Sequence, residues 1–249
     1  MDRLLSLRLD GRACQARAWF NGVPLADIGP GRECATVPVH EFAVAGTNRL
    51  ELVVVQATAG DSRARLRLLL TATGHPVDAM GAADATTLAS IYGHPPQARR
   101  AVDIALPLRF PRWRWLDAAP AAPTPALLRN TRSLLQGLIR GLAEGDSTGL
   151  LAATRLRTEE IATAYGLGTH AATQRLREAL AAWHADGLRW CPLADDAPLV
   201  LSPVAGGRLF ECLDADGGPV LRTDADALGT THALPLRVAS VEDRPHVLR

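Results

Sequence analysis

The chain has 249 residues, of which 47% are hydrophobic and 21% are charged, a composition typical of a globular protein. The formal net charge is +1, and all 27 basic residues are arginine because lysine is absent. Without lysine the chain cannot use Schiff-base chemistry, a P-loop lysine or a lysine general base. The balanced charge argues against general nucleic-acid binding, which requires a clustered surplus of cations.

No targeting or membrane segment is recognisable in the sequence. The first residues contain no apolar run of signal-peptide length, and no window approaches the roughly 18 apolar residues of a membrane span. The four cysteines are widely spaced and form no CxxC pair, so reduced thiols are expected rather than a zinc site. We therefore expect a cytoplasmic protein that binds no metal or cofactor and no membrane.

Residues 1–116 carry the pattern of a β-sandwich domain. Leucines alternate with polar residues over 5–9, and Leu66, Leu68 and Leu70 repeat this spacing with Arg65 and Arg67 alternating with the first two, a period of two that suits half-buried strands. Asn21-Gly22 is a strong signal for a tight turn because both residue types tolerate positive φ. Short strands separated by Gly, Asn and Pro are typical of an antiparallel sandwich.

One stretch of this domain resembles a known family. The segment RAWFNGVPLADIGPGRECATVPVHEFAVAGTNRLELVV (17–54) is similar to the jelly-roll, galactose-binding-like modules attached to glycoside hydrolases. That resemblance implies a jelly-roll fold and, through Trp19 beside Asn21, a possible role in stacking on a sugar ring. A sheet-face aromatic next to a turn asparagine explains the same pair without a ligand.

The segment from 74 to 100 is poorly periodic and predicts a long connection with one helical turn near residues 84–92. His75 and His94 each precede a proline, which favours an extended backbone at both. A pair of metal ligands and two solvated loop histidines are the alternatives, and the loop explanation is the simpler one.

Trp113, Arg114 and Trp115 then place two aromatic side chains around a cation. On an exposed strand they would form a stacking strip; otherwise they pack at the junction between domains. The residues that follow, 117–125, are rich in Pro and Ala and predict a linker to a second domain over 126–249.

The second domain reads as three helices followed by strands, which indicates an α+β fold with the helices against a curved antiparallel sheet. Thr124-Pro125 opens the first helix as an N-cap and first helical residue. The residues LLQGLIRGLAEGDSTGLLA (134–152) and LPLRVASVEDRPHVLR (234–249) resemble the cone fold of the nuclear transport factor two-like superfamily. That superfamily contains enzymes, ligand binders and protein-interaction domains, so the resemblance leaves the function open.

No nucleophile elbow, HExxH, Walker A or GxGxxG motif is present, and no catalytic residue is assigned. An open cone would nevertheless offer a pocket, and acid–base chemistry there would need a carboxylate within reach of a histidine. The candidate pocket residues are Asp146, Tyr165, His170, His184 and His232. Each also has an ordinary explanation as a helix cap, a helix-end residue or a packing residue.

Arg155 and Arg157, next to Glu159 and Glu160, form a mixed-charge patch that suits either a solvated helix face or a protein interface. Together these features predict a non-catalytic protein-binding protein. Its concrete form would be a bacterial immunity or adaptor protein whose partner is a toxin or a secretion component. The alternatives are an enzyme or small-molecule binder using the second domain, and a carbohydrate-binding module using the first.

Overall fold

The computed structural model describes residues 3–57, 61–72, 85–94, 99–226 and 229–249. Internal contacts divide the chain into two compact units. The first comprises Met1–Arg112 with Ala164–Gly166, and the second comprises Trp113–Thr163 with Leu167–Arg249. Within the described residues, no helix is both long and apolar enough to span a membrane.

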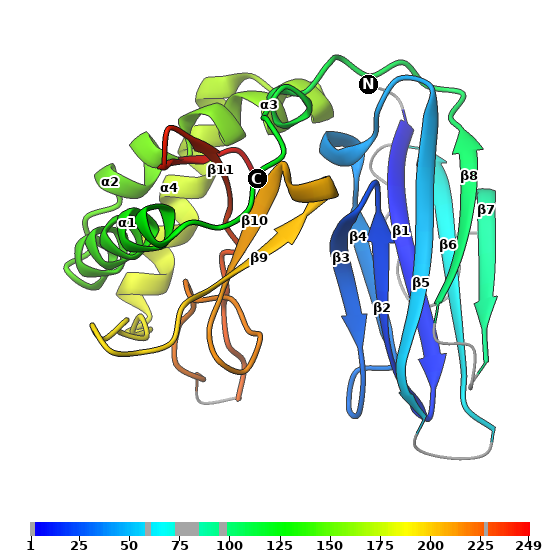
Figure 1. The fold of residues 1–249 in the computed structure, drawn as a ribbon, viewed down its shortest axis with the longest axis horizontal. Helices are drawn as coiled ribbons and strands as arrows, with labels where there is room; N and C mark the ends of the chain where they lie inside the picture. The colour runs from blue at the N-terminus through cyan, green and yellow to red at the C-terminus, as the bar shows by residue number, and fades with distance from the viewer. Residues whose placement is uncertain (1–2, 58–60, 73–84, 95–98, 227–228) are drawn as a thin grey trace. The chain divides into compact units, whose positions relative to one another are not determined.

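The first unit is built from two antiparallel four-stranded sheets (Figure 1). Their strand orders are β4-β1-β6-β7 and β3-β2-β5-β8. The strands are β1 (Arg3–Arg12), β2 (Cys14–Phe20), β3 (Val23–Ile28), β4 (Cys34–Pro38), β5 (Thr47–Ala57), β6 (Arg63–Ala72), β7 (Thr86–Gly93) and β8 (Arg99–Ala105).

The alternation of apolar and polar residues in the sequence shows which face of each strand is buried in the core of this unit. On β1 the side chains of Leu5, Leu7 and Leu9 are fully buried, and the residues between them lie on the other face. On β2 the apolar residues from Cys14 to Phe20 are buried in the same alternating way. Burial of these two leucine- and alanine-rich faces drives the two sheets together.

The prediction of a helical turn near 84–92 is wrong where the structure describes this segment. Residues 86–93 form β7, which pairs antiparallel with β6. A register shift at Leu68/Leu69 interrupts this pairing. The shift moves alternating residues to the other face, which explains why the segment showed no clean period of two. Residues 73–84 and 95–98 of the predicted connection, including His75, lie outside the described residues.

The second unit contains four helices in the fully described range 113–226, rather than the three predicted. They are α1 (Pro125–Ala143), α2 (Thr148–Ala153), α3 (Arg155–Tyr165) and α4 (Thr169–Ala185). The extra break falls between α2 and α3 at Thr154, whose hydroxyl donates to the carbonyl of Leu150 at 2.7 Å. Such back-bonding by threonine competes with the helical hydrogen-bond ladder and bends the chain.

The strands of the second unit form one antiparallel meander in the order β12-β11-β10-β9. They are β9 (Val200–Val204), β10 (Leu209–Leu213), β11 (Arg237–Val241) and β12 (Arg244–Val247). The run of strands expected after the helices does not begin directly, because within residues 188–193 only Trp190 makes a bridge, to Thr223. Pro192 lacks the N–H needed to continue a ladder there.

Apolar side chains from the helices and the sheet form one buried cluster in the second unit. It includes Leu135 and Leu138 of α1, Leu180 of α4, and Phe210 and Val238 of the sheet, with Trp183 packed against it. Taken together, three antiparallel sheets and four helices make the protein a β-rich member of the α+β class.

Candidate functional site

The outer face of the sheet β4-β1-β6-β7 carries an unusual concentration of arginine. In the antiparallel register of β1 and β6, Arg8 lies opposite Arg67 and Arg12 lies opposite Arg63. Like charges directly opposite one another destabilise an antiparallel pair, and here nearby carboxylates offset the repulsion, since Asp10 pairs with Arg8 and Arg67 and Asp61 pairs with Arg12. We call this surface the arginine face, and its members are Arg8, Arg12, Arg63, Arg65 and Arg67.

A single carboxylate sits inside the arginine face. Asp10 accepts a hydrogen bond from Nε of Arg8 at 2.9 Å and another from Nη2 of Arg67 at 2.7 Å. Burial alone would raise the pKa of Asp10, but the hydrogen bonds from Arg67 and Arg8 outweigh it and hold the pKa below its ordinary value. Asp10 is therefore ionised at neutral pH and balances only part of the local positive charge.

Arg65 is held in place by an aromatic ring. Its guanidinium carbon lies 4.9 Å from the ring centroid of Tyr92, and its Nε donates to Oγ of Ser90 at 3.3 Å. Tyr92 is 49% exposed, so the stacked pair faces solvent. A cation stacked on an aromatic ring keeps its charge while losing less conformational freedom when it binds.

These side chains surround a hollow of about 580 Å³ at one end of the sheet. This volume falls in the range of small-ligand sites. Its lining includes four arginines, with Asp10 as the only acidic residue, and comprises Asp10, Gly11, Arg12, Arg63, Ala64, Arg65, Arg67, Tyr92 and His94.

The positive charge of the arginines that line the hollow exceeds the negative charge of its one lining carboxylate. Within the described residues, no ion pair involves Arg63 or Arg65, and Arg12 pairs only with Asp61, with both side chains about 60% exposed. Nε of Arg67 is buried and has no hydrogen-bond acceptor among the same residues. An oxyanion entering the hollow would find donors that are positioned but not used.

Asn21, one of the predicted binding residues, uses its amide groups within the protein. Its Nδ2 donates to the carbonyl of Phe42 and to Oδ1 of Asn48, both at 2.8 Å, and its Oδ1 accepts from the backbone N–H of Arg49 at 2.8 Å. The residue has φ of +51°, a conformation that asparagine tolerates well. Asn21 thus fixes the turn and the start of β5.

Trp19 lies next to that turn on the outer face of β2 and is half-buried. It stands opposite Pro24 of β3 and Glu51 of β5. Its indole N–H is buried and has no hydrogen-bond partner among the described residues. Trp19 and Asn21 therefore lie close together, but the side chain of Asn21 hydrogen-bonds within the turn whereas that of Trp19 lies on the outer face of the sheet.

The predicted aromatic strip is not on the surface. Trp113 is 1% exposed and Trp115 is 2% exposed, so neither ring is available for stacking on a ligand. Burial of these large rings is favoured because each removes a large apolar area from water. The prediction that these rings pack against the protein fits their burial better than the prediction of an exposed stacking strip.

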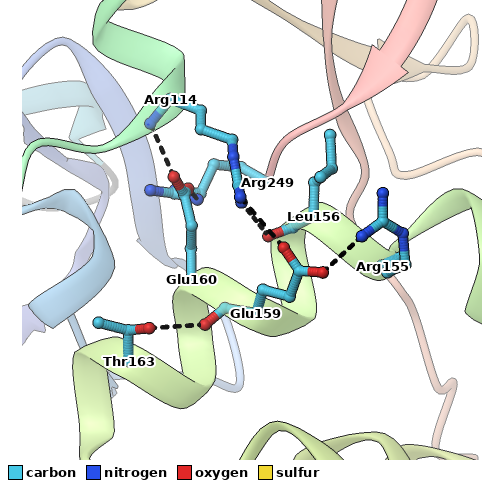
Figure 2. Close-up of polar contacts among 7 residues, drawn as sticks. All are labelled: Arg114, Arg155, Leu156, Glu159, Glu160, Thr163 and Arg249. Carbon is cyan, nitrogen blue, oxygen red and sulfur yellow. Dashed lines mark hydrogen bonds and ion pairs between the residues drawn. The ribbon is translucent and has the colours of Figure 1, made fainter.

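Some side chains of the predicted arginine patch form ion pairs with neighbouring carboxylates (Figure 2). Glu159 pairs with Arg155 at 2.6 Å and with Arg114 at 3.1 Å. The side chain of Arg157 is half-buried. Glu160 is buried rather than solvated: it accepts from the backbone N–H of Arg114 at 2.7 Å and forms an ion pair with Arg249.

The predicted pocket residues are not gathered around one cavity. Oδ1 of Asp146 accepts from the backbone N–H of Thr148 at 2.8 Å, and the pKa of Asp146 is lowered first by hydrogen bonding with the Thr148 side chain and then by this N–H. The ring of His184 lies against Gly145 beside it, but no hydrogen bond joins His184 to Asp146 within the described residues 99–226. His170 is exposed in the first turn of α4.

The remaining two pocket candidates lie elsewhere. The ring centroid of His232 is 4.9 Å from that of Trp183. Tyr165 belongs to the first unit, where its hydroxyl donates to Glu41 and its ring stacks on His40. The space between the helices and the sheet of the second unit is occupied by the leucine- and tryptophan-rich cluster described above.

The thiols show no sign of activation. Burial is the largest influence on each and raises the pKa of Cys14, Cys34 and Cys191, and it raises the pKa of Cys212 to about 12. A thiol whose pKa is raised is a poor nucleophile at neutral pH. No cluster of three or more His, Cys, Asp or Glu suited to a metal ion occurs among the described residues.

The fold and this site define a β-rich α+β protein with a cationic surface on one sheet. Comparisons with protein-family models, with curated proteins and with solved structures find no match to the chain. What the arginine face can do therefore follows from its geometry. Sequence reasoning missed it, although arginine at alternate positions 63, 65 and 67 of a predicted strand was a readable signal.

Proposed function

We propose that the chain is a non-catalytic recognition protein that binds an acidic partner protein through the arginine face. Its concrete form is a bacterial immunity or adaptor protein that acts in the cytoplasm, with a toxin or a secretion component as the partner. Arginine suits this role because its planar fork binds carboxylates bidentately and its weak hydration lowers the cost of burial at an interface.

One observation carries the proposal: Arg63 and Arg65, on the outer face of β6, form no ion pair among the described residues, although Arg63 stands opposite Arg12. Cations left without a carboxylate partner are expected where a binding function requires them. The surplus charge is also local, since the net charge of the whole chain is only +1. A local cationic surface favours a partner with a matching acidic patch and speeds its association.

Binding of a fluorescent oligo-glutamate peptide to the full chain tests the proposal. The double variant Arg63→Ala/Arg65→Ala should weaken binding at least about tenfold, because a hydrogen bond to a charged group contributes roughly 1.5–3 kcal/mol. The double variant Arg175→Ala/Arg177→Ala removes the same charge from exposed positions of α4 and should bind like the wild type.

The same variants extend the test to the natural partner. Affinity capture with the wild-type chain should recover a stoichiometric acidic protein, and capture with Arg63→Ala/Arg65→Ala should lose it. Absence of any stoichiometric partner, together with equal peptide binding by the two double variants, would rule out the proposal.

We also infer the finer fold assignments, a jelly-roll-like sandwich for the first unit and a cone-like fold for the second. The nested antiparallel pairing of β1 with β6 and of β2 with β5 supports the first assignment. The helices followed by an antiparallel meander support the second. An experimental structure with a different strand order in either unit would overturn the corresponding assignment.

A further inference from the structure

The arginines of β6 recur at every second residue on the outer face of the sheet. Arg63, Arg65 and Arg67 alternate with the buried residues Ala64, Leu66 and Leu68. Alternate residues of a strand are roughly 7 Å apart along its axis. An extended ligand has the same repeat, whereas neighbouring residues on one face of a helix are three or four positions apart in sequence.

We infer that the arginine face recognises an extended acidic segment whose carboxylates occur at alternate positions. The inference rests on the proposed function, because it assumes that the partner is an acidic protein, and it adds the conformation and spacing of the recognised segment. The ligand would run along β6 and place carboxylates near Arg63 and Arg65, while Asp10 already pairs with Arg67.

Asp10 shows how a carboxylate is accommodated on this surface. It lies between Arg8 and Arg67, with oxygen-to-nitrogen distances of 2.9 and 2.7 Å. Two residues further along β1, Arg12 lies opposite Arg63, with no carboxylate of β1 or β6 between them. A ligand carboxylate near Arg12 and Arg63 would repeat the arrangement that Asp10 makes with Arg8 and Arg67.

The hollow beside these arginines is large enough to admit side chains of a ligand. Its volume of about 580 Å³ is that of a small-molecule site. Tyr92 and Ser90 hold Arg65 at its edge, which reduces the entropy lost when a ligand carboxylate binds.

Three peptides of identical composition distinguish spacing from charge. The first alternates Glu and Thr, the second places the same glutamates in one block, and the third is a cross-linked helix with the same glutamates on one face, at positions i, i+3, i+4 and i+7. The full chain should bind the alternating peptide at least about tenfold more tightly than either isomer, a difference of roughly 1.4 kcal/mol.

Two variants connect this preference to the arginine face. Arg65→Lys keeps the charge but loses the planar fork, so it should reduce the preference for the alternating peptide. Arg63→Ala/Arg65→Ala should abolish the preference, while Arg175→Ala/Arg177→Ala should retain it. Circular dichroism of each variant checks that the fold is intact.

The outcomes separate this inference from the proposed function. Equal binding of the three isomers, with binding still lost in Arg63→Ala/Arg65→Ala, overturns the spacing but leaves acidic-partner recognition in place. Failure of every acidic peptide, oligo-glutamate included, overturns both. Tighter binding of a single-stranded DNA of equal charge overturns the choice of a protein ligand.

Discussion

The Asn48 side chain makes four hydrogen bonds at the corner that leads into β5. Its Oδ1 accepts from the N–H of Val44 and from Nδ2 of Asn21, both at 2.8 Å, and its Nδ2 donates to the carbonyls of Val44 and Gly46. The residue is fully buried. The Gly-x-Asn pattern in the sequence is therefore a structural corner of the fold.

Replacing Asn48 with Ala should destabilise the protein by about 2–3 kcal/mol, because it leaves buried donors and acceptors without partners. Urea unfolding followed by Trp fluorescence measures the loss. Gln174, a half-buried residue of α4 whose side chain hydrogen-bonds with the exposed Glu178 and Arg177, serves as the control, and Gln174→Ala should change stability by less than about 0.5 kcal/mol. Similar values for the two variants would contradict the assigned role of Asn48.

His40 is a fully buried, neutral histidine in the first unit. Its Nε2 accepts from the N–H of Leu5 at 2.6 Å, so the proton lies on Nδ1, which donates to the carbonyl of Ala164 at 3.0 Å. Burial lowers the pKa of His40, and the hydrogen bond to Ala164 opposes this effect without reversing it. Protonation of Nε2 would remove the acceptor that Leu5 requires.

Because the pKa of His40 is lower in the folded than in the unfolded state, the unfolded chain binds the proton more strongly. The free energy of unfolding should therefore be constant above about pH 6.5 and fall as the pH drops from there toward the folded pKa, by at most about 1.4 kcal/mol per unit. Hydrogen exchange of the Leu5 amide, measured as a function of pH, reports the loss.

A matched pair of variants isolates His40 from the other histidines. His40→Gln removes the titration and should flatten the pH dependence over this range, whereas His246→Gln, at an exposed position of β12, should keep the wild-type slope. An unchanged slope in His40→Gln would assign the acid sensitivity to another group.

At the scale of elements, α1 contains two glycines that differ in their surroundings. A Cβ added to Gly137 would meet no atom within 4 Å, whereas one added to Gly141 would lie 3.0 Å from the carbonyl oxygen of Asp146. Gly137→Ala should therefore stabilise the protein by about 0.5–1 kcal/mol through helix propensity. Gly141→Ala should gain less or destabilise, and thermal unfolding of both variants checks the order.

The adjacent glutamates of α3 provide a second comparison. Glu160 is buried in an ion pair with Arg249, while the Glu159 side chain is 28% exposed and pairs with Arg155 and Arg114 (Figure 2). Glu160→Gln should cost about 3–5 kcal/mol, since it breaks a buried pair and leaves the cation behind. Glu159→Gln should cost about 0–1 kcal/mol, as expected for exposed pairs. Equal losses in chemical denaturation would contradict this assignment.

The local spacing of apolar residues predicted the elements in which burial follows one period. It failed where strand pairing or a side-chain hydrogen bond determines the structure. β1, β2 and α1 were readable because their apolar residues follow one period throughout. β7 was not, because its bulge against β6 breaks the period. The split between α2 and α3 depends on one hydroxyl bond at Thr154, which composition does not reveal.

At the scale of the molecule, the net charge was a misleading guide to the charge of individual surfaces. A net charge of +1 suggested no cationic surface, yet strand pairing brings Arg8 and Arg12 of β1 beside Arg63, Arg65 and Arg67 of β6. These residues are about fifty positions apart, so no local window joins them. The two tryptophans in 113–115 are the opposite case. They form a conspicuous motif in the sequence, which suggested a binding surface, but both side chains are buried.

The arginine face should therefore behave as a local electrostatic surface on a nearly neutral protein. Raising salt from about 0.1 M to about 1 M shortens the Debye length from roughly 10 Å to roughly 3 Å, so the affinity for oligo-glutamate should fall at least about tenfold. Either double variant, Arg63→Ala/Arg65→Ala or Arg175→Ala/Arg177→Ala, lowers the formal net charge from +1 to −1.

If the arginine face carries the binding, only Arg63→Ala/Arg65→Ala should flatten the salt dependence, because it removes cations that contact the ligand. If the net charge of the protein determines binding, both double variants should flatten the salt dependence equally. Fluorescence anisotropy across the salt series separates the two cases, since the variants differ only in where the two charges were removed.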